Sequence, residues 1–344
     1  MFSRKRTADD GGCSGLAETS SFMLQPYHER SAVTGAGLTQ VDKAMSPGPM
    51  IFDRRLLHVR QSRARALGPA VFLLDHAAAE LAERLSAVMR RFELAVDLGT
   101  PTDAVRRALA ATGKIGAIVA AADALDRDSS YLRVAADEEA LPFADQSLDL
   151  VVSALSLQFV NDLPGTLIQI RRALKPDGLM LAALIGGDSL TELREVFAAA
   201  ETEIEGGVSP RVAPFADLRQ LGELLQRAGF ALPVIDSERL IVRYDSVFGL
   251  VRDLRHMGAT NVLIERRRKP LKRATVQRMA QLYAERFADP DGRIRASFEI
   301  IWLSGWVPHE SQQKPLMPGT AARRLSDALN TKEISAGEKT GRSG

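Results

Sequence analysis

A glycine next to an aspartate follows the first short apolar run of the folded part of this sequence. In Asp97-Leu98-Gly99 the glycine would let the backbone approach a ligand, and the aspartate can hold a ribose or an amino group. Nucleotide-binding loops normally repeat glycine in G-x-G spacing, whereas Pro101 follows here and has no N–H to donate. A plain strand-to-helix turn with Pro101 at the helix start fits the same residues, so both interpretations stay open.

An acidic string that begins at Asp137 and reads DEEALPF is the second candidate. We expect Asp137 just beyond a strand, where its carboxylate can accept a hydrogen bond from an exocyclic amine such as adenine N6. A solvated acidic turn is the alternative, but the Leu-Pro-Phe that follows makes the string more specific than a charge cluster requires. Asp123, after an earlier apolar run, is the expected ribose ligand, although Asp126 and Asp128 compete for that role or cap a helix.

A polar and an aromatic residue, Gln158 and Phe159, follow another apolar run within SALSLQFV. Both would stand over the crevice at the strand ends, where they could position a substrate or cover a cofactor. They are therefore the candidate catalytic residues. A buried helix start explains them equally well.

Other chemistries lack their usual sequence signals. The five histidines show no metal-ligand spacing and Cys13 is the single cysteine, so we expect no metal site and a reducing compartment. No G-x-S-x-G elbow and no Walker loop occurs, which excludes serine hydrolases and P-loop nucleotidases. The basic run Arg266 to Lys269, with Lys272 and Arg273, predicts a solvated loop or a docking site for an acidic partner.

Length and charge limit the remaining classes. The 344 residues are 45% hydrophobic and correspond to about two domains with a sizeable core. A net charge of +2 requires no nucleic-acid partner. No window approaches about 18 consecutive apolar residues, so no transmembrane segment is expected and we anticipate a soluble intracellular protein.

Short apolar runs alternate with amphipathic stretches, which indicates a doubly wound α/β fold whose ligand crevice lies beyond the carboxyl ends of the strands. Strands are expected at 94–98, 115–121, 131–135, 148–153, 179–185, 239–244 and 297–302, with the turn KPDG at 175–178. Helices are expected at 52–66, 70–90, 103–112, 163–174, 189–205, 215–228 and 246–257. We expect a disordered leader at 1–49, a folded domain at 50–329 (core about 92–186, cap helices and closing strands 187–318) and a flexible tail at 330–344.

In order, VDLG, AD, ADEEALPFADQSLDLVVSALSLQFVNDLP and LKPDG resemble the motifs of class I S-adenosylmethionine-dependent methyltransferases. More narrowly, GGDSLTELR, AETEIEGGVSPRVAPF, LLQRAGF, MGATN and EIIWLSGWVPHESQQKP resemble the family of the respiratory complex I assembly factor that hydroxylates an arginine of an iron-sulfur subunit. This resemblance covers about residues 52–315. It implies a mostly parallel seven-stranded sheet of the Rossmann-like methyltransferase type, with added N-terminal and cap helices.

The resemblance further implies S-adenosylmethionine as the cofactor. The cofactor-binding positions expected on this basis are Asp97, Gly99, Asp123, Asp137, Glu138 and Leu155. The family pattern D-x-G-x-G-x-G is replaced by DLGTPTD, which lacks its second and third glycines and puts the contact to the methionine end in doubt.

The expected function is modification of an arginine or another side chain of a respiratory complex I subunit, with methyl transfer and hydroxylation both open. One alternative is a methyltransferase of a small molecule or carrier protein, similar to the malonyl-carrier O-methyltransferase of biotin synthesis. Another is a chaperone without catalysis. The expected location is the cytoplasm of a bacterium or the mitochondrial matrix of a eukaryote, with possible peripheral contact to a membrane complex.

Overall fold

The computed structural model describes residues 50–122, 131–215, 217–312 and 331, all of which belong to the unit Ser46–Gly344. The predicted leader 1–49 and all of the predicted tail except residue 331 lie outside the described residues. Asp123, Asp126 and Asp128 lie outside them as well, so their expected roles stay predictions.

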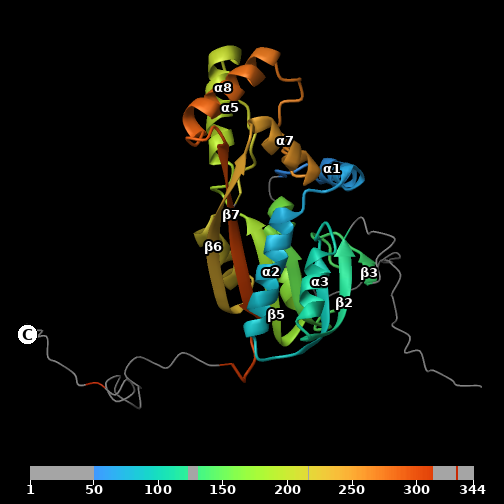
Figure 1. Cartoon of the computed structure of the whole chain (residues 1–344). Coiled ribbons are helices and arrows are strands. Elements are labelled where there is room, and N and C mark those ends of the chain that lie inside the picture. Colours follow the sequence, from blue (N-terminus) through green and yellow to red (C-terminus); the bar gives the residue numbers. More distant parts are fainter. Residues whose placement is uncertain (1–49, 123–130, 216, 313–330, 332–344) are drawn as a thin grey trace, which may run out of the picture. The chain divides into compact units, whose positions relative to one another are not determined.

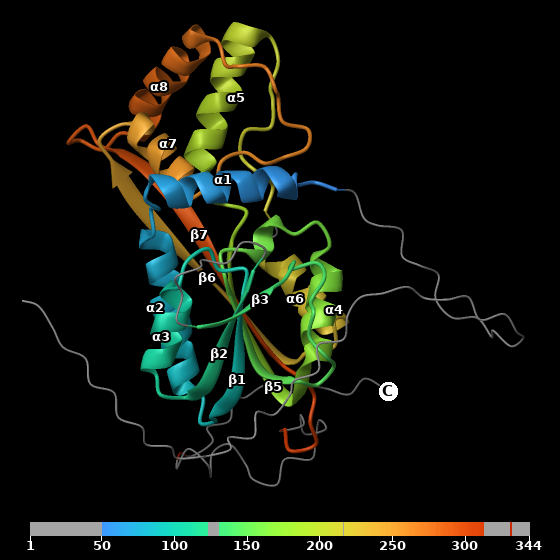
Figure 2. The ribbon, with the colours of Figure 1, turned by 90° about the vertical axis from the view of Figure 1, so that its right-hand side faces the viewer.

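A seven-stranded sheet with the order β3-β2-β1-β4-β5-β7-β6 forms the centre of this unit (Figures 1 and 2). Neighbouring strands are parallel except where β7 pairs with β5 and with β6. The bounds are β1 Phe92–Leu98, β2 Ile115–Ala122, β3 Leu132–Ala135, β4 Leu148–Ala154, β5 Leu174–Ile185, β6 Ala231–Tyr244 and β7 Ile294–Trp306. The α/β fold class predicted from the sequence is confirmed.

Helices cover both faces of the sheet, which explains why the central strands are almost continuously apolar. One face packs against α2 (Phe72–Ala87) and α3 (Ala104–Ala111), and the other packs against α4 (Leu163–Ala173) and α6 (Leu218–Arg227) (Figure 2). The two buried clusters meet at β4, whose seven residues are all buried.

A cap stands beyond the carboxyl ends of the parallel strands. The long strands β6 and β7 extend to α5 (Thr191–Glu205), α7 (Val247–His256) and α8 (Arg273–Phe287), and these elements share a third buried cluster (Figure 1). Helix α1 (Arg54–Leu67) contacts α7 below this cap, and the short 3-10 helix η1 (Leu157–Phe159) follows β4. The crevice is therefore bordered by the sheet, α1 and the cap.

The structure corrects some of the expected element bounds. The predicted turn KPDG at 175–178 is not a turn ahead of the strand but part of β5, where the pairing with β4 jumps from Leu148–Leu174 to Leu150–Leu179 and accommodates the extra residues as a bulge. Asp177, with φ +62°, supplies the bend. Strands β6 and β7 are longer than expected, and α8 was not predicted.

Candidate functional site

Asp97 lies at the end of β1 but faces the interior. Its side chain has no exposed surface, and its two carboxylate oxygens accept hydrogen bonds from Thr100 Oγ1 and Arg106 Nη1. Burial raises the pKa of Asp97 from 3.8 to about 6, although Arg106 and Thr100 lower it. The geometry makes Asp97 an anchor for the loop after β1, and its expected contact with a cofactor stays a prediction.

Gly99 lies directly after β1, with φ +72°, a conformation that favours glycine. Its N–H donates to Ala121 O at 2.7 Å. A Cβ at this position would lie 2.9 Å from Ser156 Cβ and would overlap Ser156 Oγ and Glu138 Oε1. The backbone of Gly99 is thus approached closely by the side chains of Ser156 and Glu138, and its expected contact with a ligand stays a prediction.

Three consecutive carboxylates after β3, Asp137, Glu138 and Glu139, converge on the guanidinium of Arg54; we call them the acid cluster. Arg54 Nη1 lies 2.7 Å from Asp137 Oδ1 and 3.2 Å from Glu139 Oε1, while Arg54 Nη2 donates to Glu138 Oε2. One guanidinium for three carboxylates leaves the acid cluster with an excess of negative charge. Such a site favours a cationic ligand.

The members of the acid cluster differ in accessibility. The Asp137 side chain is 49% exposed, so its carboxylate can meet a ligand at the mouth of the crevice. Glu138 is buried, and its Oε1 accepts a hydrogen bond of 2.7 Å from Ser156 Oγ after β4. Asp137 and Glu138, both predicted from the sequence, are thereby brought together with Gly99. Arg54 and Ser156 were not predicted.

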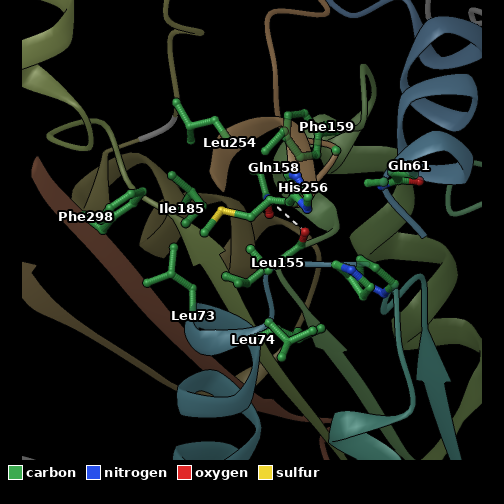
Figure 3. Close-up of a pocket in the computed structure, with 18 of the residues that line it drawn as sticks. Gln61, Leu73, Leu74, Leu155, Gln158, Phe159, Ile185, Leu254, His256 and Phe298 are labelled. Atoms are coloured by element: carbon green, nitrogen blue, oxygen red, sulfur yellow. Dashed lines mark hydrogen bonds between the residues drawn. The ribbon is translucent and has the colours of Figure 1, made fainter. Parts of the chain in front are cut away.

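A cavity of about 100 Å³ lies between the strand ends, α1 and the cap (Figure 3). Apolar side chains from α2, β5, α7 and β7 dominate its lining: Leu73, Leu74, Ile185, Leu254 and Phe298. Pro101 and Thr102 from the loop after β1 also border it. An apolar cavity with few polar groups is typical of a substrate site.

Leu155, Gln158 and Phe159 all line this cavity, as the sequence predicted for the last two (Figure 3). Gln158 Nε2 donates to Leu155 O at 2.8 Å, while Gln158 Oε1 is buried without a partner among the described residues. Leu155 has φ +53°, a strained conformation for a leucine that is common near functional sites. Gln158 therefore presents a hydrogen-bond acceptor inside an apolar cavity.

His256 is a further polar residue in the lining that the sequence did not single out. Its Nδ1 lies 2.6 Å from Gly68 O, and because a carbonyl only accepts, Nδ1 carries the hydrogen. In a neutral imidazole, Nε2 is then an acceptor. Spacing along the chain offered no signal for His256, because its place in the cavity depends on packing between α1 and α7.

The basic run at 266–273 is largely engaged within the chain. Arg266 pairs with Asp53 at 3.0 Å, and Arg267 and Lys272 both pair with Glu205. In the described ranges, no group of three or more His, Cys, Asp and Glu side chains is placed to hold a metal ion. None of the helices in the described part of the chain combines the length and apolar composition needed to cross a bilayer.

Comparison with known proteins identifies relatives of this chain. A methyltransferase domain model matches residues 96–182, the region from β1 to β5. Arginine-hydroxylase NDUFAF5, mitochondrial, from Mus musculus is 38% identical over 298 residues, which cover 84% of this chain and 87% of that protein. The Homo sapiens protein of the same name is 38% identical over 313 residues, 86% of this chain and 90% of that protein.

A second group of relatives is similar over a shorter stretch. Malonyl-[acyl-carrier protein] O-methyltransferase from Laribacter hongkongensis is 39% identical over 186 residues, which cover 54% of this chain and 60% of that protein. The similarity to the arginine-hydroxylases covers a much larger part of the chain. With a methyltransferase domain at its core, the chain belongs to the NDUFAF5 arginine-hydroxylase family.

Proposed function

We propose that this protein binds S-adenosylmethionine at the ends of β1, β3 and β4 and modifies an arginine side chain of a protein substrate. The observation that carries the proposal is the extent of similarity to the arginine-hydroxylases, which covers 84–86% of the chain. A shared methyltransferase core alone would account for residues 96–182.

The residues at the strand ends fit this cofactor chemically. Gly99 brings the backbone of the loop after β1 against Glu138 and Ser156 at the strand ends, and the exposed carboxylate of Asp137 suits the amino group of adenine. The excess negative charge of the acid cluster suits a molecule that carries a sulfonium and an ammonium group. When bound, S-adenosylmethionine supplies an electrophilic methyl group.

The apolar cavity would then receive the aliphatic part of the substrate side chain. Gln158 Oε1, the buried acceptor without a partner among the described residues, would orient an N–H of that side chain. Phe159 would exclude water, because its ring packs edge-on against Phe52 and Phe215 at centroid distances of 5.8 and 6.2 Å. These residues bind and orient the substrate side chain, and positioning of this kind supplies much of the rate of a group-transfer reaction.

The proposed partner is a subunit of respiratory complex I, met during assembly in the bacterial cytoplasm or the mitochondrial matrix. The relatives named arginine-hydroxylase are themselves described as mitochondrial. Contact with a membrane complex would be peripheral. Intact-mass analysis of candidate substrates would identify the particular subunit.

A second candidate function is methyl transfer to a carrier protein or small molecule. It is favoured by the 39% identity to the malonyl-carrier enzyme, which covers 54% of the chain. A third candidate, an assembly chaperone without catalysis, would keep the fold and the cavity but not bind the cofactor.

Calorimetric titration with S-adenosylmethionine, followed by intact-mass analysis of candidate substrates, separates these functions. We expect micromolar binding and a complex I subunit that gains either an oxygen or a methyl group. A methylated carrier protein instead would support the second candidate. Absence of binding at millimolar cofactor would contradict the proposed function and leave the chaperone.

A further inference from the structure

The backbone that leads into α1 crosses the mouth of the crevice; we call residues 51–54, which end at the first residue of α1, the N-terminal strap. Asn161 Oδ1 accepts from Ile51 N at 2.8 Å and from Phe52 N at 2.7 Å, and its Nδ2 donates to Phe52 O. On the opposite side, Asp53 N donates to Val262 O at 2.8 Å. The N-terminal strap is thus held both by the segment after η1 and by the loop after α7.

Arg54 extends from the N-terminal strap into the acid cluster. Its Nη2 bonds Glu138 Oε2, while the other oxygen of Glu138 accepts from Ser156 Oγ at 2.7 Å and adjoins Gly99. A continuous chain of polar contacts therefore runs from α1, through the end of β3, to the end of β4. Its middle member, Glu138, lies against the backbone expected to approach the cofactor.

The charges make this arrangement depend on Arg54. The Arg54 side chain is only 12% exposed, and burial lowers its pKa, but Glu138, Asp137 and Glu139 outweigh that effect and raise the pKa above its ordinary value. Arg54 therefore stays cationic. Without it, three neighbouring carboxylates would repel one another, and Glu138 would be buried without a counter-charge.

Two nitrogens of Arg54, Nε and Nη1, are buried and have no hydrogen-bond partner among the described residues. Nη1 makes ion pairs with Asp137 and Glu139, whereas no contact is seen for Nε in the described part of the chain. A buried donor of this kind usually meets a water molecule or a ligand acceptor. The guanidinium is therefore placed both to fix the acid cluster and to donate toward a bound molecule.

We propose that Arg54 is a positioning residue of the cofactor site, which holds Asp137 and Glu138 in the arrangement that receives S-adenosylmethionine and couples the N-terminal strap to cofactor binding. This inference rests on the proposed function. A planar fork that meets several carboxylates at once is a task for arginine that lysine performs poorly.

The test compares S-adenosylmethionine binding by calorimetry in the full-length wild type, Arg54→Gln and Arg54→Lys, with hydrogen exchange of peptides covering 131–145. Arg266→Gln is the matched control, since Arg266 pairs with Asp53 of the same strap but does not touch the acid cluster. We expect Arg54→Gln to weaken binding at least about tenfold and to speed exchange after β3. Arg54→Lys should restore part of the affinity, and Arg266→Gln should stay within about threefold of wild type.

Each alternative result has a distinct meaning. Wild-type affinity in Arg54→Gln overturns the inference and leaves the proposed function intact. An equal loss in Arg54→Gln and Arg266→Gln also overturns it, because anchoring of the strap would then suffice. No binding by the wild type overturns both proposals. If Arg54→Gln does not fold, Arg54→Lys decides, and unchanged affinity with unchanged exchange in that variant overturns the inference.

Discussion

Replacement of Arg106 by glutamine should destabilise the protein by an amount that grows with pH. Arg106 Nη1 and Thr100 Oγ1 are the donors to Asp97, whose side chain has no exposed surface. Without the guanidinium, the buried carboxylate keeps only the hydroxyl. Removal of one partner from a buried ion pair costs about 3–5 kcal/mol, and this is the loss expected at neutral pH and above.

The pH dependence follows from the raised pKa of Asp97. Burial moves this pKa from 3.8 to about 6, a shift that corresponds to about 3 kcal/mol. The native state holds the proton to higher pH than the unfolded chain. The carboxyl's contribution to stability is therefore fully present below about pH 4 and is lost as the pH rises through about 6. Loss of Arg106 raises the pKa further, so the penalty of Arg106→Gln shrinks near about pH 5, where the carboxyl is protonated.

Urea unfolding of the wild type and Arg106→Gln at about pH 5, 6, 7 and 8 measures this penalty. Arg107→Gln on the same helix is the control, because Arg107 is 63% exposed and its pair with Asp103 lies at the surface. The control should change the unfolding free energy by less than about 0.5 kcal/mol at every pH. An equal penalty for Arg106→Gln at pH 5 and pH 8, or one no larger than that of the control, would refute the reasoning.

Three further substitutions probe the site and the cap. Gly99→Ala should cost about 1–3 kcal/mol because of its positive φ and the contact with Ser156, and calorimetry should show loss of cofactor binding; unchanged stability and affinity would contradict this. Gln158→Leu should leave cofactor affinity unchanged but slow modification of the protein substrate at least about tenfold, and equal rates would remove Gln158 from the site. Glu201→Gln, which removes the charge of a fully buried carboxylate paired with the partly buried Arg211, should lower the thermal midpoint and expose the loop after α5 to proteases, whereas a wild-type cleavage pattern would oppose this.

The sequence predicts the central sheet well because its strands are buried on both faces. Short, mostly apolar runs such as 148–153 can be recognised as strands without knowledge of the strands they pair with, and the observed β4 spans Leu148–Ala154. The closing strands differ from this pattern: β6 alternates between exposed and half-buried residues over 14 positions, whereas β7 is mostly buried over 13, and only 239–244 and 297–302 were predicted. Helix α8 went unrecognised because its burial depends on α5, which lies far away in the sequence.

Residues of the candidate site could be predicted where their place after a strand determines where they lie in the fold. Asp137 follows a strand and Gly99 ends another, so their place at the crevice follows from topology alone. Arg54 could not be predicted, because it meets Glu138 across 84 residues of sequence and lies on a helix ahead of the sheet. For Asp97 the position at the strand end was predicted but not the direction of its side chain, because nothing in the sequence reveals that Arg106 holds the carboxylate in the interior.

The loss of glycines from the loop DLGTPTD is related to the presence of the acid cluster after β3. Pro101 and Asp103 stand where the second and third glycines of the pattern would be, and Pro101 has no N–H, so the loop after β1 offers a ligand fewer backbone donors than the usual glycine-rich loop. We therefore expect recognition of the cofactor to shift from the loop after β1 to the carboxylates after β3. Arg54 compensates part of the charge of those carboxylates. We therefore expect the loss of loop glycines to make the N-terminal strap more important for cofactor binding, and not to make the cofactor unnecessary.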